Sequence, residues 1–293
     1  MLSQPGITNL NLGVIGNCTV NAAIDAMGRI VWSCHPRPDG DPVFHALLNG
    51  PDPFSPTARG FCSIEIENFA HAEQRYVHNT AVLKTILHDT AGNALEITDF
   101  SPRFELFGRM FCPATYIRRI KPLSGRPRIR VRVRPAFEYG KVVPEITRGS
   151  HHVRYVYPGH TLRLTTDLPV SYVIDETCFV LDGPGNLIIG ADEPIEEALP
   201  GLARSFEERT IRYWREWVRP LAVPLETKLG LCFAIDEKAR ISTLVKLVET
   251  NIFAHRVRKL YVSSEGAELD QDLVQTGLGY HVGVSDGQDY QVR

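Results

Sequence analysis

Short runs of apolar residues alternate with polar turn residues over roughly the first two thirds of the chain. Within these runs hydrophobic and polar positions often alternate, which is typical of half-buried β-strands. Clusters of glycine, proline, asparagine and aspartate, such as 89–93 and 182–185, separate the runs. The pattern predicts strands at residues 64–66, 81–87, 95–100, 116–120, 129–133, 152–157, 162–165, 171–174, 178–181 and 187–189.

Many short strands at near-regular spacing, without a helix of crossover length between them, predict a mainly β fold. We expect a large, supersandwich-like antiparallel β-sandwich over residues 1–193. The period changes to helical between residues 195 and 218, where Phe206, Trp214 and Trp217 fall on one face. This segment predicts a linker helix within 194–224, broken or kinked at Pro200 and Gly201 and ended by Pro220.

The chain changes character again after Pro224. Apolar residues at helical spacing predict a helix over 236–253, and strands are expected over 259–263 and 279–285. We therefore expect residues 225–293 to form a partial α/β tail. Its strand-like last residues predict a domain that is cut short or fused.

Charge and composition exclude several classes of protein. The 293 residues carry a formal net charge of −2, and no apolar run approaches the ~20 residues of a membrane span. No secretory leader is visible, so we expect a cytoplasmic protein without membrane association and with no general attraction to nucleic acid. The six cysteines include no C-x-x-C spacing, which predicts free thiols.

Motifs for common cofactors are missing from the sequence. It contains no phosphate-binding loop, dinucleotide fingerprint, H-E-x-x-H helix or G-x-S-x-G elbow. The adjacent His151 and His152 point to opposite faces of a strand and cannot easily share one metal ion. The sequence therefore predicts neither a cofactor nor a metal site.

Five arginines alternate with other residues between positions 126 and 134, which places them on one face of a strand. They are Arg126, Arg128, Arg130, Arg132 and Arg134. One interpretation is a surface that binds anions or nucleic acid. The other is a solvated sheet face whose charges discourage edge pairing, and the near-zero net charge favours it.

Carboxylates near an aromatic residue form a second candidate site. Glycoside hydrolysis needs an acid and a base or nucleophile. Asp39 and Asp41 lie close to Trp32, and an aromatic platform with nearby carboxylates suits a sugar. Both aspartates are equally explained as turn residues beside proline and glycine. Asp99 and Glu138 are the other carboxylates that a hydrolase could use.

Several segments resemble the opening of prokaryotic glycoside hydrolase family 15 proteins, the glucoamylase-, glucodextranase- and trehalase-like enzymes. The segments LGVIGN (12–17), AAID (22–25), GRIVWSCHPRPD (28–39) and PVFHALL (42–48) resemble their trehalase-like N-terminal domain. Further similar segments are TDFSPR (98–103), RRIKPLSG (118–125), RPAFEYG (134–140) and YWREW (213–217). The resemblance covers roughly residues 8–220 in the order of the family.

This resemblance implies a β-sandwich whose linker helix leads into an (α/α)6 barrel that carries both catalytic glutamates. No barrel signature follows Trp217, so no residue of this chain is assigned a catalytic role. The resemblance implies that the sandwich packs on a barrel, with the loop of Trp32, Arg37, Asp39 and Asp41 nearest the sugar. The expected partners are a separate barrel chain or a second copy of this chain.

The tail resembles a different family. The segments RKLYVSSEGAELDQ (258–271), GYHV (279–282) and SDG (285–287) are similar to the N-terminal domain of modulator-of-gyrase metalloproteases. The metal-binding helix of that family is missing. Together the two resemblances imply a fused gene product whose main part is a non-catalytic domain for α-glucoside, trehalose or maltooligosaccharide metabolism. An active hydrolase and an anion-binding module are the alternatives.

Overall fold

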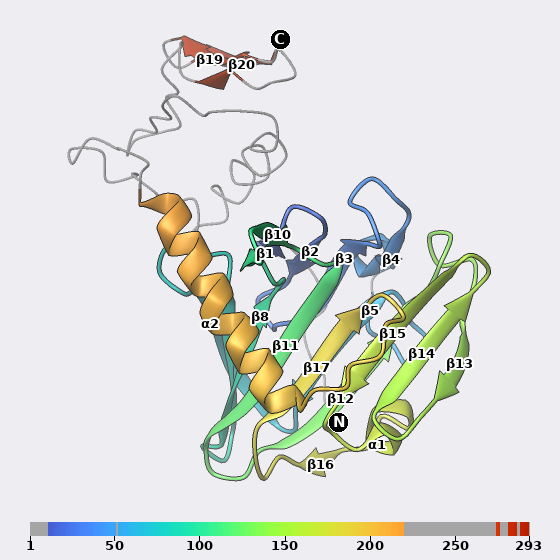
Figure 1. Cartoon of the computed structure of the whole chain (residues 1–293). Helices are drawn as coiled ribbons and strands as arrows, with labels where there is room; N and C mark the ends of the chain where they lie inside the picture. The colour runs from blue at the N-terminus through green and yellow to red at the C-terminus, as the bar shows by residue number, and fades with distance from the viewer. Residues whose placement is uncertain (1–10, 51, 220–273, 276–280, 286–287, 293) are drawn as a thin grey trace.

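The structure is a computed structural model that describes residues 11–50, 52–219, 274–275, 281–285 and 288–292. The expected helix over 236–253, the expected strand over 259–263 and Cys232 lie outside the described residues. Two antiparallel sheets make up the main body (Figure 1). This arrangement confirms the predicted mainly β, antiparallel sandwich.

The smaller sheet has seven strands in the order β1-β2-β3-β5-β12-β16, with β4 paired to β3. Its strands are β1 (Gly13–Gly16), β2 (Asn21–Ile24), β3 (Ile30–Cys34), β4 (Pro42–Phe44), β5 (Phe61–Ile66), β12 (Arg128–Arg134) and β16 (Phe179–Val180). A 3-10 turn, η1 (Ala46–Leu48), follows β4.

The larger sheet has eight strands in the order β13-β14-β15-β17-β11-β8-β7-β6. Its strands are β6 (Phe69–Tyr76), β7 (Leu83–Asp89), β8 (Ala94–Phe100), β11 (Thr115–Ser124), β13 (Glu145–Arg148), β14 (His152–Tyr157), β15 (His160–Thr166) and β17 (Gly185–Gly190). A separate hairpin pairs β9 (Phe104–Leu106) with β10 (Arg109–Phe111). In the tail, β18 (Val274–Gln275), β19 (His281–Ser285) and β20 (Gln288–Val292) form a three-stranded sheet, and β19 lies within the expected strand 279–285.

The main core lies between the two large sheets. It includes Ile64 and Val131 from the smaller sheet and Ile97 and Leu164 from the larger one, all essentially without solvent exposure. Successive side chains of strand β11 point to opposite faces of the larger sheet and so belong to different hydrophobic layers. Tyr116 belongs to the core between the sheets, whereas Ile117 belongs to a second cluster on the outer face.

The long helix α2 (Leu199–Val218) crosses that outer face (Figure 1). Its Leu199 and Ala203 pack in one cluster with Ile117 and Ile188 of the sheet. The predicted linker helix therefore packs on the sandwich. The predicted start at 195 is wrong, since the helix begins at Leu199. The predicted break at Pro200 is also wrong. A proline fits in the first turn of a helix because the N–H that it lacks would have no partner there.

A second correction concerns residues 171–174, which were predicted as a strand. They belong to the short helix α1 (Val170–Ile174). The Tyr172 N–H donates to the carbonyl oxygen of Pro169, and the Asp175 N–H donates to that of Ser171. Val170 and Val173 are buried at helical spacing, so tertiary packing outweighs the strand preference of β-branched residues.

Cys34, Cys62, Cys112 and Cys178 are free thiols, as predicted. Cys34 and Cys62 are buried, and Cys18, Cys112 and Cys178 are partly buried. Among the described helices, none is long and apolar enough to cross a membrane.

Candidate functional site

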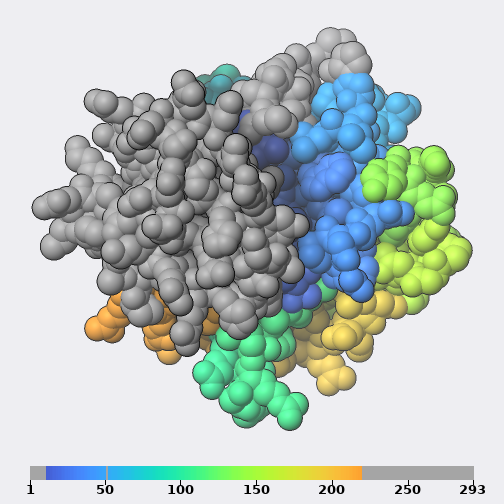
Figure 2. Space-filling model, turned by 90° about the horizontal axis from the view of Figure 1, so that it is seen from above, coloured from blue at the N-terminus to red at the C-terminus, as the bar shows by residue number. Residues whose placement is uncertain are grey.

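The loop that joins β3 to β4 lies at the same end of the sandwich as the turn between β1 and β2. The Tyr116 hydroxyl marks this end, because it lies 3.0 Å from the carbonyl oxygen of Asn21 and also contacts the Ser33 hydroxyl. The turn between β14 and β15 lies there too, since His160 contacts His35. Figure 2 looks down on this end and shows the blue surface around β3 and β4 beside green surface near residue 150.

His35 and His160 form a pair beneath the loop. The His35 Nε2 lies 2.9 Å from the carbonyl oxygen of Ala114, and its Nδ1 lies 3.1 Å from His160 Nε2. Because a carbonyl oxygen only accepts, a neutral His35 donates through Nε2 and accepts the His160 Nε2–H through Nδ1. Burial, together with the nearby His160, lowers the pKa of His35 to about 4, and burial also lowers the pKa of His160. Both rings are therefore neutral near pH 7.

Arg37 and Asp39 form an exposed, two-pronged ion pair. The Arg37 Nε and Nη2 donate to the two Asp39 carboxylate oxygens at 2.9 and 2.7 Å. This hydrogen bonding lowers the pKa of Asp39 and raises that of Arg37. Asp39 is consequently ionised and already paired, which suits it to hold the loop or accept hydroxyl hydrogen bonds rather than to donate a proton.

The charge of Asp41 acts on two other groups of the site. Its negative charge adds to the effect of burial in raising the pKa of Cys34. The same charge adds to other effects that raise the pKa of Tyr157. Asp41 is exposed, so its carboxylate is available at the surface.

A tight hairpin at residues 137–142 completes the site. Glu138, Tyr139 and Gly140 have φ values of 49°, 56° and 88°, a run of left-handed conformations that non-glycine residues rarely adopt. The Tyr157 hydroxyl donates to the Glu138 carboxylate, and this hydrogen bond raises the pKa of Tyr157. Phe137 stacks on Tyr157 with ring centroids 4.8 Å apart. The side chain of Tyr139 is left projecting into solvent, with the residue 55% exposed.

The ring of His45 explains why position 140 of this hairpin is a glycine. A Cβ atom at Gly140 would lie 2.9 Å from His45 Cε1, and one at Gly60 would lie 2.6 Å from it. The ring of His45 thus lies close to two backbone segments that approach it only where no side chain intervenes. Burial lowers the pKa of His45, so this ring is also neutral.

The structure brings some of the predicted site residues together and places another elsewhere. It joins Arg37 to Asp39 and brings Asp41 near Tyr157, but it packs the half-buried Trp32 against the cluster on the outer face of the smaller sheet. Sequence reasoning named Glu138 and missed Tyr139, Tyr157 and His160. The left-handed Glu-Tyr-Gly run is the one local signal that could have drawn attention to this hairpin.

Asp99, a carboxylate considered for hydrolysis, lies in the interior. Its side chain and that of Arg118 have no solvent exposure, and Arg118 Nε donates to Asp99 Oδ1 at 2.7 Å. A carboxylate closed off in this way cannot reach a substrate. Asp99 has a structural role.

The arginine strand is β12, and its environment corrects the expectation of a solvated face. Arg132 is buried, and its guanidinium lies 3.1 Å from the Glu65 carboxylate and 3.3 Å from that of Glu176. Arg134 pairs with Glu176 and donates to the carbonyl oxygens of Pro56 and Ala58. The loop before β5 therefore covers this end of the strand.

Arg126, which precedes β12, and Arg128, its first residue, are also paired. Arg126 lies 2.6 Å from Asp182, and Arg128 lies 2.7 Å from Glu67. Four of the five arginines therefore have a carboxylate partner, which offsets the positive charge that an anion-binding surface requires.

The described residues thus form a mainly β domain, a two-sheet antiparallel sandwich with a long helix on its outer face and with polar and aromatic loops at one end. Residues 5–175 match the family described as trehalase-like, N-terminal, and the chain belongs to this family. No curated protein and no solved structure matches the chain.

Proposed function

We propose that this chain supplies the non-catalytic β-sandwich domain of a glycoside hydrolase of family 15 type, acting in α-glucoside, trehalose or maltooligosaccharide metabolism. In this proposal the sandwich packs against an (α/α)6 catalytic barrel and directs the loop of residues 32–41 toward the bound sugar. The barrel belongs to a partner chain or to another part of the same protein.

The direction of α2 is the observation that carries the proposal. Arg103 connects this helix to the loop end, since its guanidinium donates to the carbonyl oxygen of Asn17 and lies 5.1 Å from the ring of Tyr213. Asn17 belongs to the turn between β1 and β2. Helix α2 therefore ends at the loop end of the sandwich, on the side of the β1–β2 turn (Figure 1), and a domain that follows this helix would start at that end.

The surface chemistry at this end supports contact with a carbohydrate. Exposed Asp41 and the Glu138 carboxylate accept hydrogen bonds from hydroxyl groups, and the exposed ring of Tyr139 offers an apolar face. The Arg37–Asp39 pair adds fixed donors and acceptors. These groups lie on loops at the surface, so we expect weak binding that assists a deeper site elsewhere.

The carboxylates support this role better than they support hydrolysis by the sandwich itself. Asp39 is ionised and paired, Asp99 is closed to solvent, and Glu138 accepts a hydrogen bond from Tyr157. A hydrolase needs one carboxyl group that holds its proton and a second that is ionised, at a defined separation. The paired arginines of β12 likewise weaken the alternative of a nucleic-acid-binding module.

Two measurements test the proposal. We expect the purified chain to release no glucose from trehalose, maltose or maltotriose. In heteronuclear NMR spectra, millimolar sugar is expected to shift the amide signals of residues 37–41 and 138–139. The variants Asp41→Asn and Glu138→Gln should weaken these shifts. Asp182→Asn, an exposed ion-paired aspartate at the other end of the sandwich, is the control and should leave them unchanged.

Other results would redirect the proposal. Glucose release that disappears in Asp41→Asn or Glu138→Gln would identify the sandwich as a hydrolase. If no sugar shifts the loop signals, the loop has no carbohydrate-binding role. A catalytic barrel of a family 15 enzyme that neither binds the chain nor changes its activity on mixing would oppose the docking role.

A further inference from the structure

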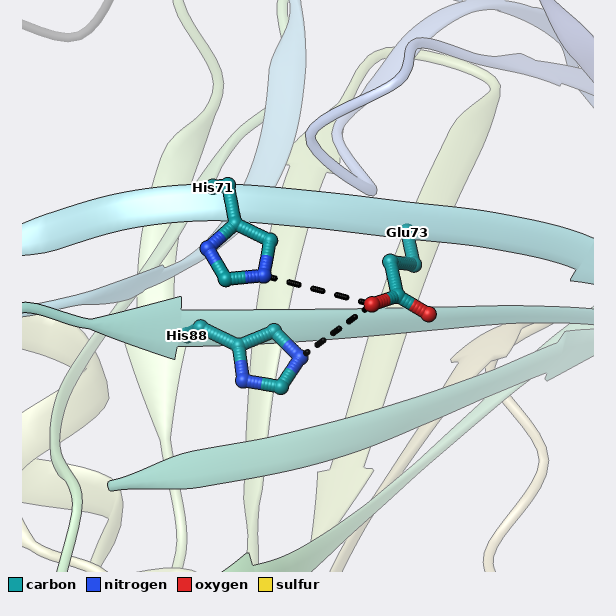
Figure 3. Close-up of side chains that lie close together, drawn as sticks. All are labelled: His71, Glu73 and His88. Carbon is teal, nitrogen blue, oxygen red and sulfur yellow. Dashed lines mark ion pairs between the residues drawn. The ribbon is translucent and has the colours of Figure 1, made fainter. Parts of the chain in front are cut away.

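Three side chains converge on the outer face of the larger sheet, at its β6 edge. In the register of the β6–β7 hairpin, His71 lies directly opposite His88, and Glu73 follows His71 by two residues on the same face (Figure 3). Ala72 and Gln74, which alternate with them, point toward the core side, where Gln74 donates to the Asp25 carbonyl oxygen. The hairpin therefore fixes two imidazoles and one carboxylate side by side.

The Nε2 atoms of both imidazole rings lie on the side that faces the Glu73 carboxylate (Figure 3). The two imidazole rings are stacked, with centroids 4.3 Å apart and an interplanar angle of 4°. The Nε2 atoms of His71 and His88 each lie 3.9 Å from Glu73 Oε1, and all three donor atoms lie within 4.8 Å of one another.

A small movement would bring these atoms to coordination distance. Zinc bonds of about 2.0–2.1 Å place tetrahedral ligand atoms about 3.3 Å apart. The two distances from Glu73 must therefore shorten by about 0.6 Å, and the distance between the two imidazole nitrogens by up to about 1.5 Å. The side chains of His71 and Glu73 are 59% and 63% exposed, so rotation about their own bonds can provide this change.

An independent observation concerns the Nε2 atom of His88. This atom is buried, yet it has no hydrogen-bond partner among the described residues. A buried ring nitrogen without a partner is uncommon in native proteins and calls for an explanation. A metal ion held between the two rings and Glu73 gives the nitrogen the ligand bond that the protein itself does not provide.

We propose that His71, Glu73 and His88 bind a divalent transition-metal ion, with Zn²⁺ as the ion that best suits the set. Two neutral imidazoles and one carboxylate are a recognised zinc ligand combination, and water would fill the remaining coordination position. Glu96 lies across Ile86 from Glu73 in the sheet register, and it already pairs with Lys84 at 2.9 Å. The carboxylate available to the metal ion is that of Glu73.

This site is independent of the proposed carbohydrate-facing loops. His88 precedes the turn at residues 89–93, where the Asn93 side chain accepts from the N–H of Arg126, at the far end of the sandwich. The other end of the same hairpin carries His78, whose carbonyl oxygen accepts from Arg215 of α2. Failure of one proposal therefore leaves the other unaffected.

The test is a metal titration of the full chain, prepared without a histidine tag. Isothermal calorimetry with ZnCl₂ and visible absorption spectra with CoCl₂ should both report one ion per chain. We expect His71→Ala and His88→Ala each to weaken binding by at least about tenfold, and Glu73→Gln to weaken it by a similar or smaller factor. His78→Ala, an exposed histidine of the same hairpin, is the matched control and should bind as the parent chain does.

Folding is checked separately, by thermal unfolding in the presence of a chelator. His71→Ala and Glu73→Gln alter exposed side chains and should unfold at the midpoint of the parent chain, so they carry the test even if His88→Ala is destabilised. Equal binding by the parent chain, His71→Ala and Glu73→Gln would overturn the proposal. The same follows if His78→Ala weakens binding as much as they do.

Discussion

Arg118 and Asp99 face each other directly across β11 and β8, inside the sandwich and without solvent exposure. The same guanidinium donates to the carbonyl oxygens of Cys62 and Gly28, both from the smaller-sheet side of the core. One arginine therefore satisfies acceptors from both layers. Because Asp99 is the carboxylate that pairs with this charge among the described residues, the stability of the sandwich depends on keeping this pair intact.

Replacing Asp99 alone should strongly destabilise the domain. Asp99→Ala leaves the Arg118 charge buried and unpaired, and we expect a loss of about 3–5 kcal/mol in the free energy of unfolding. Urea titration followed by tryptophan fluorescence measures this change. Asp182→Ala, whose partner Arg126 is exposed, should leave the midpoint almost unchanged. If the double variant Asp99→Leu with Arg118→Met is no more stable than Asp99→Ala, the unpaired charge is not the cause.

The stability of the chain should fall as the pH decreases below about 6.5. Burial lowers the pKa of His35 to about 4, whereas its unfolded value is near 6.5. Between these values the unfolded chain binds more protons, so the free energy of unfolding decreases with falling pH by up to about 1.4 kcal/mol per pH unit for this group. His45 and His160, whose pKa values are also lowered, act in the same direction.

His35→Gln tests this assignment. The variant should be less stable than the parent at neutral pH, because it loses the contacts to Ala114 and His160. Its stability should depend less steeply on pH between about pH 5 and pH 6.5. Urea midpoints at several pH values compare the two chains. Equal slopes would show that other groups cause the pH dependence.

Gly140 and Gly92 allow the effect of crowding to be separated from that of backbone conformation. Their φ values are 88° and 85°, but a Cβ atom meets His45 at Gly140 and nothing within 4 Å at Gly92. Gly92→Ala should cost about 1 kcal/mol from conformation alone, and Gly140→Ala should cost more. Thermal unfolding of both variants measures the difference. His45→Ala combined with Gly140→Ala should remove the additional loss, and a loss that persists would rule out the contact with His45.

The packing of α2 can be tested at Ala203, which is completely buried in the cluster beneath the helix. Ala203→Leu introduces three further carbon atoms into a closed interface, and we expect a destabilisation of about 1–3 kcal/mol. Ser205→Leu adds a leucine at an exposed position of the same helix and should have little effect. Comparable unfolding midpoints for the two variants would contradict the tight packing of α2 on the sheet.

Local patterns predicted much of this fold. Alternation in 129–133 placed Ile129, Val131 and Val133 inside, where all three are buried, because period and burial are both local properties of a strand. The helical spacing of Phe206, Trp214 and Trp217 likewise predicted helix α2. Helix α1 was missed because Val170 and Val173 favour a strand locally, and only packing against the core decides otherwise.

The candidate site was harder to predict, since its groups come from distant segments. The loop residues Arg37, Asp39 and Asp41 lie close together in the sequence, whereas Tyr157 and His160 reach them only through sheet pairing. The position of Arg132 depends on Glu176, which is 44 residues away. His71 and Glu73 are two residues apart in the sequence, but the hairpin register that adds His88 could not be read from spacing alone.

The length of helix α2 determines both how far the chain travels along the sheet and the direction in which it leaves the sandwich. Its 20 residues span about 30 Å, enough to carry the chain along the sheet from the far end to the loop end. Each residue also turns the helix by about 100°, so its length sets the direction in which any following domain faces. Inserting two residues after Trp214 would rotate such a domain by about 200° while leaving the sandwich intact. Relatives that keep the same loops but differ in the length of this helix are expected to present them to a different face of their partner.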